Sequence, residues 1–414
     1  MAERRSPFYD YHLRHAGQLV KGGGDYMFPV AYTSGVDEHL NTRTNVGMQD
    51  ISSMGEVDIK GPGAERLINR LVVNEISNME PGQMRYTTMC NENGGIVDDI
   101  TVYKFNDEHF MIVTSSAPRK NAVRWLAEHA LGSSTYVTEI SGAVALVVIQ
   151  GPRSREFLRS VVEEIDLNTL PFFRFTPTVI NDTELLLSRS GYTGELGYEL
   201  YIPAEDAGSV WEFLLKQGKP FGLQPYGVLA MQSLRMEKAF PLYGPDISAD
   251  VTPFHVGLDR WIRFDKREFV GREALLRVQE TGIHERWVGL ILEGNAPANA
   301  NDAIHSISDV ASFRRKKRSG SEAGEATDAA APGEQIGRIT SSTKGHSVDK
   351  MLAFGYVRTS HAWPGSKLLV MTGGRPVVAT VAQTPFFDPS GARMRAKATD
   401  SLNRVATKPV TPNK

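Results

Sequence analysis

The sequence is poor in cysteine and in long hydrophobic runs. Cys90 is the only cysteine among 414 residues. A single thiol excludes an internal disulfide framework and any zinc or iron–sulfur site that needs two thiolates from one chain. No hydrophobic run approaches the roughly 18 residues that cross a bilayer, and the N-terminal segment lacks the apolar core of a secretory signal. We therefore expect a cytoplasmic protein with no membrane partner.

An excess of one charge is also missing. The chain has 46 Lys and Arg against 48 Asp and Glu, which leaves a formal charge of -2. No global field would hold nucleic acid, so we expect no nucleic-acid partner. The P-loop, H-E-x-x-H and C-x-x-C patterns are absent. The ten histidines show no metal-ligand spacing, and no metal is predicted.

The residues that are present predict an α+β fold. Hydrophobic residues make up 41% of the chain, enough to fill the cores of two or three domains. Strand-like runs with β-branched and aromatic residues alternate with amphipathic stretches of helical spacing. The predicted strands are 55–61, 98–105, 109–116, 145–151 and 183–190, and the predicted helices are 116–131, 151–165, 204–218 and 225–240.

The composition changes near residue 303. Residues 303–334 are polar and include the basic run Arg314 to Arg318, which predicts a mobile, solvated insertion rather than a nucleic-acid patch. Strand-like runs follow it and predict a small antiparallel sheet or barrel. We expect a first region over 1–275, a second over 276–395 and a polar tail over 396–414.

A turn at Gly94 and Gly95 leads into two adjacent carboxylates, Asp98 and Asp99. Neighbouring strand residues point to opposite faces, so only one of the two acids can face a given cavity. Taken alone, this pattern favours a hairpin with solvated acids.

The second constellation spans residues 188–199, where three glycines are interleaved with Tyr192, Glu195 and Tyr198. Glycines permit close backbone approach. Such a loop can hold a flat heterocycle between an acid and an aromatic ring.

The two constellations, GGIVDDITVYK and SRSGYTGELGYEL, resemble the paired motifs of the aminomethyltransferase family, whose founding member is the T-protein of the glycine cleavage system. Residues 42–76, 85–95, 233–254 and 269–275 resemble further family segments in the same order, and the terminal strands resemble its C-terminal barrel. The resemblance implies a three-lobed folate-binding fold with two interleaved α+β lobes over 1–275, a C-terminal antiparallel β-barrel, and tetrahydrofolate as cofactor.

The resemblance also implies site residues. Asp98 matches the family's essential carboxylate near the reacting nitrogens of folate, and Glu195 matches the acid that accepts hydrogen bonds from the pterin. A carboxylate suits the adjacent N–H donors of an aminopterin. The remaining candidates are equally consistent with packing or ion pairing: Tyr86, Tyr103, Tyr192, Tyr198 and Arg235.

Departures from the T-protein pattern point to a different donor pocket. Met231 and Gln232 replace an arginine and an acid, and His255 and Trp261 follow in the central loop. We predict that His255, Trp261 and Tyr32 bind an aryl carboxylate, with His255 as a cation and as the group that meets the leaving oxygen. The alternative is that His255 is a packed loop residue.

The predicted function is a tetrahydrofolate-dependent demethylase. It would move a methyl group from a small donor, most plausibly a methoxylated aromatic acid, to N5 of folate, with Asp98 orienting folate. Three alternatives stay open: a T-protein served by a lipoyl carrier protein, a demethylase of a sulfonium or N-methyl donor, and a non-enzymatic folate binder that supports iron–sulfur maintenance. The cysteine motif of that last group is absent.

Overall fold

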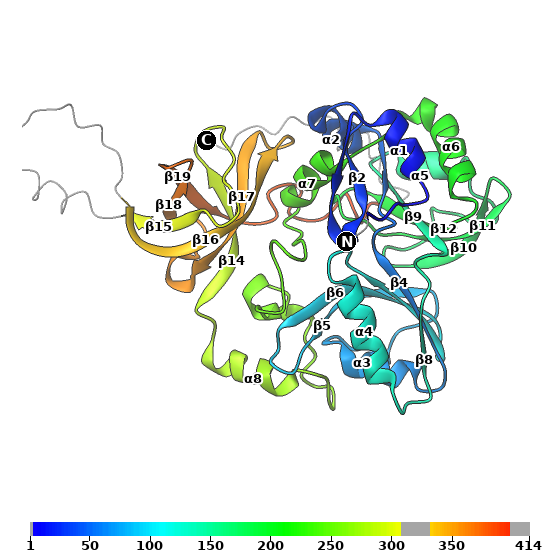
Figure 1. Ribbon diagram of the computed structural model, residues 1–414, viewed down its shortest axis with the longest axis horizontal. Coiled ribbons are helices and arrows are strands. Elements are labelled where there is room, and N and C mark those ends of the chain that lie inside the picture. The colour runs from blue at the N-terminus through cyan, green and yellow to red at the C-terminus, as the bar shows by residue number, and fades with distance from the viewer. Residues whose placement is uncertain (1–2, 308–331, 398–414) are drawn as a thin grey trace, which may run out of the picture.

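Residues 3–307 and 332–397 are described by a computed structural model, and they form three lobes (Figure 1). The first lobe contains a six-stranded sheet of order β10-β11-β12-β9-β3-β13. The second contains a five-stranded sheet of order β5-β6-β7-β4-β8, and the third is a closed barrel of order β14-β17-β16-β15-β18-β19. The predicted α+β fold with a C-terminal antiparallel barrel is confirmed.

The first two lobes are interleaved along the chain. Strand β3 (Val46–Asp50) belongs to the first sheet, the next five strands build the second sheet, and β9 (Val144–Gln150) returns to the first. The other strands of the first sheet are β10 (Phe175–Ile180), β11 (Thr183–Ser188), β12 (Gly197–Pro203) and β13 (Leu223–Pro225). An N-terminal arm adds β1 (Gln18–Lys21) and β2 (Met27–Ala31) as a separate pair.

Helices cover the first sheet on the side away from the second lobe. Apolar residues of β9, β11 and β12 pack with Val210, Trp211 and Leu214 of α6 (Ala207–Gly218) in one fully buried core. These three residues recur at the spacing of a helix face, which explains why this segment is helical. The other helices of this lobe are α1 (Tyr9–His15), α2 (Gly35–Thr44), α5 (Ser154–Leu158) and α7 (Val228–Glu237). Helix α7 packs through Ala230 and Leu234 on Val148, which lies on the opposite face of the sheet.

The second lobe repeats this arrangement on a smaller scale. Helix α3 (Ala64–Leu71) buries Ala64, Leu67, Ile68 and Leu71, which line one helix face. Helix α4 (Arg119–Ala130) packs beside it against the same side of the sheet. The strands are β4 (Gly55–Lys60), β5 (Gln83–Cys90), β6 (Ile96–Asn106), β7 (His109–Thr114) and β8 (Tyr136–Glu139).

The barrel closes because β14 pairs with both β17 and β19. Two of its strands were not predicted: β14 (Glu285–Leu292), and β15 (Ala303–Ile307), which lies at the start of the predicted insertion. The rest of that insertion, 308–331, and the tail beyond 397 lie outside the described residues. The other strands are β16 (Pro332–Gly345), β17 (Lys350–Arg358), β18 (Lys367–Thr372) and β19 (Arg375–Ala382).

A central segment connects α7 to the barrel. It contains two short 3-10 turns, η3 (Pro253–Val256) and η4 (Asp259–Trp261), followed by α8 (Arg272–Thr281). Lys266 anchors it to the second lobe, because its Nζ donates to the carbonyls of Val72 at 2.8 Å and Asn74 at 2.7 Å. The remaining 3-10 turns are η1 (Gly23–Asp25), η2 (Lys219–Phe221) and η5 (Thr359–His361).

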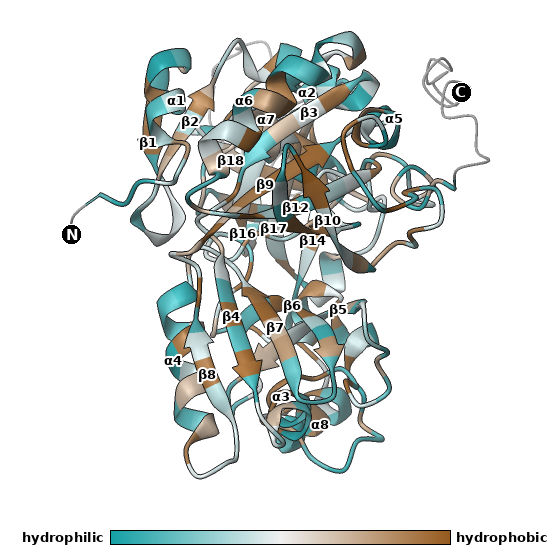
Figure 2. Ribbon diagram, turned by 90° about the vertical axis from the view of Figure 1, so that its right-hand side faces the viewer, coloured by the Kyte–Doolittle hydropathy of each residue, from teal (hydrophilic) through white to brown (hydrophobic). Residues whose placement is uncertain are grey.

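The opposite faces of the first two sheets pack against each other, beside the part that α7 covers. We call this contact the interlobe face, and it includes Met84, Tyr103, Met111, Val113, Leu146, Phe175 and Tyr201. Figure 2 shows the hydrophobic strands β7 and β9 of the two sheets in brown, one lobe above the other. On each sheet, therefore, alternate strand residues point either to helices or to the interlobe face.

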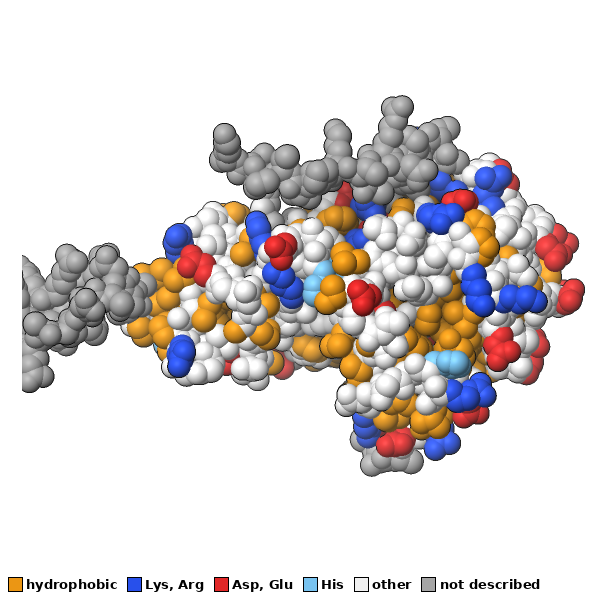
Figure 3. Space-filling model, turned by 90° about the horizontal axis from the view of Figure 1, so that it is seen from above, with side chains coloured by type: hydrophobic (Ala, Val, Ile, Leu, Met, Phe, Trp, Pro, Cys, Tyr) orange, Lys and Arg blue, Asp and Glu red, His pale blue; other side chains and the backbone are white. Residues whose placement is uncertain are grey.

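The surface carries mixed charge. On the side drawn in Figure 3, blue and red side chains are interspersed rather than gathered by sign. Within 3–307 and 332–397, none of the helices has the length and hydrophobicity to cross a membrane.

Candidate functional site

A glutamate surrounded by hydroxyl groups occupies the interlobe face. Glu199 of β12 accepts hydrogen bonds at Oε2 from Tyr103 at 3.1 Å, Ser188 at 3.1 Å and Tyr201 at 3.2 Å. Its Oε1 accepts one from Ser190 at 2.9 Å. Glu199 is partly exposed and makes no ion pair with another described residue. It is therefore an anionic acceptor with hydroxyl neighbours and spare capacity at Oε1.

The predicted cofactor residue Tyr198 lies on the other side of the same strand. Its ring is fully buried in the first-lobe core, and its hydroxyl accepts from Nε of Arg155 at 3.3 Å. Adjacent strand residues point to opposite faces. Tyr198 was expected to line the cleft, but it points into the helix-side core, and Glu199 lies on the interlobe face instead.

The same alternation separates the two aspartates of β6. Asp98 shares its face with Ile100 and Val102, which belong to the helix-covered core of the second lobe. Asp99 is partly exposed and shares its face with Tyr103, on the interlobe side. Asp99, rather than the predicted Asp98, is thus the aspartate on the interlobe side.

Asp99 lies among aromatic residues. Its Oδ2 accepts from the hydroxyl of Tyr86 at 3.0 Å, and the Tyr86 ring meets Trp261 edge-to-face at 6.5 Å. Burial raises the pKa of Asp99, and burial together with the Asp99 charge raises the pKa of Tyr86. Burial, followed by the charges of Asp98 and Asp99, raises the pKa of Tyr243 to about 12. Burial also raises the pKa of Tyr192, where the charge of Arg235 opposes the shift and that of Asp99 adds to it.

The side chain of Tyr192 is fixed by contacts with the central segment. Its hydroxyl donates to the carbonyl of Pro241 at 2.5 Å, and its ring stacks on Phe240 at 5.6 Å. The structure thus places Tyr86, Tyr192 and Trp261 around Asp99. The first two were predicted as folate-binding residues and Trp261 as a donor-pocket residue.

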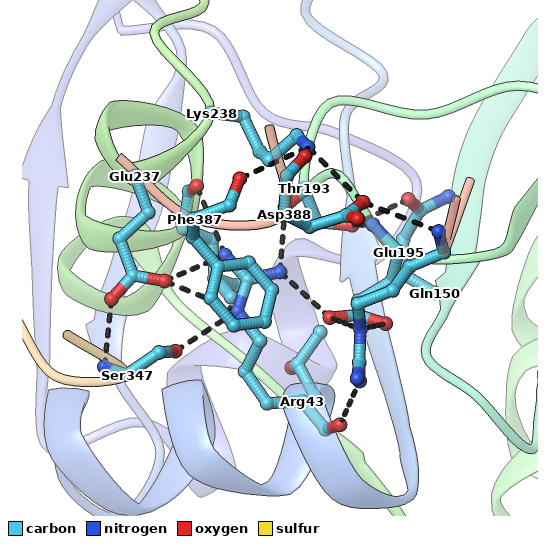
Figure 4. A network of polar contacts seen from close by, with 12 residues as sticks. Arg43, Gln150, Thr193, Glu195, Glu237, Lys238, Ser347, Phe387 and Asp388 are labelled. Carbon is cyan, nitrogen blue, oxygen red and sulfur yellow. Dashed lines mark hydrogen bonds and ion pairs between the residues drawn. The ribbon is translucent and has the colours of Figure 1, made fainter. Parts of the chain in front are cut away.

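Glu195 has a different environment from Glu199 (Figure 4). Nε of Arg393 donates to both of its oxygens, at 2.8 and 2.7 Å, and Nη1 of Arg43 donates to Oε1 at 2.9 Å. Arg43 also pairs with Glu237 at 2.8 Å. Although burial opposes it, the hydrogen bond from His39 and the charge of Arg43 lower the pKa of Glu237 to about 2. Glu195 is thus paired with two cations inside the protein, which conflicts with the predicted role in holding a pterin.

The glycines around Glu195 make room for protein side chains. A Cβ on Gly191 or Gly197 would lie about 2 Å from the amide of Gln150. Gln150 needs this space because its Oε1 accepts from Thr193 at 2.8 Å and its Nε2 donates to Ser190 at 3.1 Å. The close approach expected from these glycines therefore exists, and Gln150 occupies it.

Arg235 is fully buried and binds the barrel. Its Nη1 pairs with Asp246 at 2.7 Å and its Nη2 donates to Ser341 of β16 at 3.1 Å. Asp246 also accepts from Thr340 at 2.6 Å. Of the two roles considered from sequence, Arg235 has the ion-paired one.

The three predicted donor-pocket residues are not gathered in one place. The hydroxyl of Tyr32 bonds Nδ1 of His12 at 2.7 Å, and Nε2 of His12 bonds Asp50 of β3 at 2.8 Å, where the N-terminal segment meets the first sheet. Nδ1 of His255 accepts from the backbone N–H of Thr252 at 3.1 Å, and burial lowers the pKa of His255. This geometry keeps the proton on Nε2 and contradicts the predicted cation. Only Trp261 lies beside the Asp99 cluster.

Sequence reasoning missed Asp99 and Glu199 as the interlobe acids. Both residues lie inside the recognised motifs. The alternation of side chains along each strand was the signal that could have identified them. Asp98 is in phase with Ile100 and Val102, and Tyr198 is in phase with Leu200, whereas Asp99 is in phase with Tyr103.

Comparisons with known proteins agree with this architecture. The family profile described as the GCVT N-terminal domain matches residues 8–266, and the glycine cleavage T-protein C-terminal barrel domain matches residues 315–388. An aminomethyltransferase of Halothermothrix orenii is 33% identical over 93% of this chain and all of its own length. Another, from Bacillus mycoides, is 33% identical over 93% of this chain and 98% of its own.

A solved structure has the same fold. The glycine cleavage system aminomethyltransferase T of Bartonella henselae superimposes with a TM-score of 0.82 at 26% identity, covering 94% of this chain and 99% of that one. Tetrahydrofolate, the predicted cofactor, is the one-carbon acceptor that this family uses. On this combined coverage, the chain belongs to the aminomethyltransferase family of glycine cleavage T-proteins.

Proposed function

We propose that the protein transfers the aminomethyl carbon of an S-aminomethylated lipoyl carrier protein to tetrahydrofolate, giving 5,10-methylenetetrahydrofolate with release of ammonia and the dihydrolipoyl carrier. The observation that carries this proposal is the near-complete match to proteins named aminomethyltransferase, with 31–33% identity over 93% of the chain. It replaces the demethylase as the leading hypothesis.

The donor set of the interlobe face fits a folate. Glu199 is an anion without a cationic partner among the described residues, so its spare acceptor capacity suits the N–H donors of a neutral pterin. Glu195 has both oxygens bonded by Arg393. We therefore assign pterin binding to Glu199.

Asp99 is the proposed acid–base group. Its raised pKa, caused by burial, suits a carboxylate that takes up a proton released as the acceptor nitrogen forms its new bond. Tyr86 holds Oδ2 of Asp99 in place through its hydroxyl. Folate supplies the nucleophilic nitrogens, and the protein supplies orientation, an anionic acceptor and a proton site.

A demethylase of a methoxylated aromatic acid is the second candidate. Met231 and Gln232, where a T-protein typically has arginine and aspartate, favour it. The neutral His255 weighs against it, because an aryl carboxylate then lacks the predicted cation.

An anaerobic assay with tetrahydrofolate separates these candidates. One arm contains an aminomethylated lipoyl carrier, and the other contains methoxybenzoates, a dimethylsulfonium acid or dimethylglycine. The proposal expects 5,10-methylenetetrahydrofolate only with the carrier, and Asp99→Asn serves as the inactive control. Formation of 5-methyltetrahydrofolate from a free donor would instead establish a demethylase.

A further inference from the structure

Asp98 and Asp99 are coupled through one serine. Ser115 follows β7, and its backbone N–H donates to Oδ2 of Asp98 at 3.0 Å. Its hydroxyl donates to Oδ1 of Asp99 at 3.0 Å and to the Asp99 carbonyl at 3.2 Å. The position of Ser115 is therefore set by Asp98 on one side of the strand, and it fixes Asp99 on the other.

Asp98 is enclosed without a counterion. Its side chain is fully buried, and Oδ1 has no hydrogen-bond partner in the part of the chain that the structure describes. The titratable groups around it are acids: Asp99 on its own strand, Tyr86 on β5 and Tyr243 on the central segment, whose pKa burial and the two aspartates raise to about 12. No described lysine, arginine or histidine forms an ion pair with either aspartate.

An ionised carboxylate is strongly disfavoured in such a position, because nothing replaces its lost hydration. Two neighbouring buried carboxylates also resist ionising together. Burial, and then the charge of Asp99, raise the pKa of Asp98 well above its usual range. Since Oδ2 already accepts the Ser115 N–H, the proton belongs on Oδ1.

We propose that Asp98 is a proton-bearing positioning residue, which holds Ser115 and thereby fixes the carboxylate of Asp99 for the reaction. Its importance for turnover rests on the proposed function, in which Asp99 is the acid–base group. Asp98 contributes as a neutral hydrogen-bond acceptor of the right shape, and its own ionisation plays no part. An amide can replace it, whereas a methyl group cannot.

Matched substitutions test this assignment. Asp98→Asn preserves a neutral side chain that can accept the Ser115 N–H, so kcat is expected to stay within about threefold of wild type, with an unchanged pH profile. Asp98→Ala removes the acceptor and is expected to lower kcat about tenfold or more with little change in KM, because Asp99 is then misplaced. Asp99→Asn is expected to be essentially inactive. An Asp98→Asn protein that folds and binds folate but is as inactive as Asp99→Asn would overturn the proposal.

Infrared spectroscopy tests the proton without any donor. At pH 7 wild type is expected to show the carbonyl stretch of a protonated carboxyl group that disappears in Asp98→Asn and persists in Asp99→Asn. Glu56 is a second buried acid, so the comparison is repeated in a Glu56→Gln background. A band unaffected by Asp98→Asn would mean that Asp98 is ionised, and the proposal would be wrong.

Thermal stability supplies an independent sign. When folding raises the pKa of an acid, the protein loses stability as the pH rises from the acid's pKa in the unfolded state to its pKa in the folded state. The melting temperature of Asp98→Asn should therefore rise relative to that of wild type between pH 5 and pH 8. A difference between the two melting temperatures that stays constant with pH would contradict a proton on Asp98. Neither physical test uses a carrier or donor. Failure of the carrier assay would therefore reject the proposed function and leave standing the proton on Asp98 and its hold on Ser115.

Discussion

Glu195 and Glu199 lie four residues apart in opposite electrostatic surroundings. Glu195 is bonded by Arg393 and Arg43, whereas the described neighbours of Glu199 are the hydroxyls of tyrosines and serines. A buried carboxylate that already neutralises two guanidinium groups contributes to structure, because its removal leaves two buried positive charges without a counterion. A carboxylate without a cation remains available to a ligand.

The first prediction compares two conservative substitutions. Glu199→Gln is expected to weaken tetrahydrofolate binding by roughly 2 kcal/mol, or about thirtyfold in Kd, with little change in stability. Glu195→Gln is expected to lower the free energy of unfolding by about 3 kcal/mol, because two buried arginines lose their charged partner. Calorimetric titration and chemical denaturation measure the two effects. The assignment of the two acids is wrong if Glu195→Gln abolishes binding at full stability.

The second prediction concerns Glu56 of β4, which is fully buried with neither carboxyl oxygen hydrogen-bonded to a described residue. Burial, only partly offset by Arg119, raises its pKa to about 8. Wild type should therefore lose stability as pH rises from 4.5 towards 8, by roughly 3 kcal/mol at pH 7. Glu56→Gln should remove the part of this dependence that Glu56 contributes and leave the part that Asp98 contributes.

Melting temperatures between pH 4.5 and pH 8 measure this effect. The exposed Glu184→Gln on β11 is a suitable control, since it changes the same charge at the surface. Parallel curves for wild type and Glu56→Gln would show that Glu56 is ionised in the folded protein.

The sequence located the pair Asp98 and Asp99 but not the face of each. Both faces of β6 are buried, one by helices and one by the first lobe, so apolar alternation alone does not identify the inner side. A bulge between Met89 and Cys90 also shifts the register next to the pair. The resemblance to the family motifs therefore located the pair of aspartates. The structure was needed to show which face of β6 each one occupies.

At the scale of elements, α2 has an inverted pattern. It buries Glu38, His39 and Arg43 while Val36 and Leu40 are exposed. Its N-cap Ser34 accepts from the Asp37 N–H at 3.1 Å, which is its clearest local signal. Hydrophobic periodicity does not predict such a helix, because its buried side chains are satisfied by polar partners on other elements.

The third prediction tests the packing of the 191–197 loop against β9. Gly191→Ala is expected to destabilise the protein by about 2 kcal/mol, because the new methyl would overlap Gln150. In the double variant with Gln150→Ala the clash disappears, so the combined loss should be smaller than the sum by about 1 kcal/mol or more. A double-mutant cycle of unfolding free energies measures this coupling. Additive losses would mean that the glycine is needed for another reason.

At the scale of the whole molecule, one polar cluster joins segments that are far apart in sequence. Arg43 of α2 and Glu195 before β12 meet in Figure 4, and Arg393 after the barrel donates to the same glutamate. Nη2 of Arg393 also donates to the carbonyl of Arg43 at 2.6 Å. The segment after the last barrel strand is thus fastened to the first lobe.

The fourth prediction breaks this connection. Arg393→Met is expected to cost about 3 kcal/mol of stability, because Glu195 retains only Arg43. Faster hydrogen exchange should be concentrated in residues 387–396. The neighbouring exposed Arg395→Met is the matched control and should change neither quantity. Uniform faster exchange throughout the chain would instead indicate general destabilisation.

The three-lobed architecture could be predicted because its motifs occur in a recognisable order, and the runs from 335 to 386 are strand-like with turn residues between them. Strand β14 was missed because it follows helix α8 after a short connection, and β15 because it begins inside a polar stretch. The cluster of Arg43, Glu195 and Arg393 was not predictable, since its members are 150 or more residues apart and no local pattern relates them.

The central claim is that folate lies on the interlobe face between Glu199 and Asp99. A structure of the protein with 5-methyltetrahydrofolate tests it most directly. The account predicts pterin N–H groups on Glu199 and the N5 side of the ligand beside Asp99, with Glu195 still bound to Arg393. A pterin bonded to Glu195 or Asp98, or bound away from the interlobe face, would contradict it.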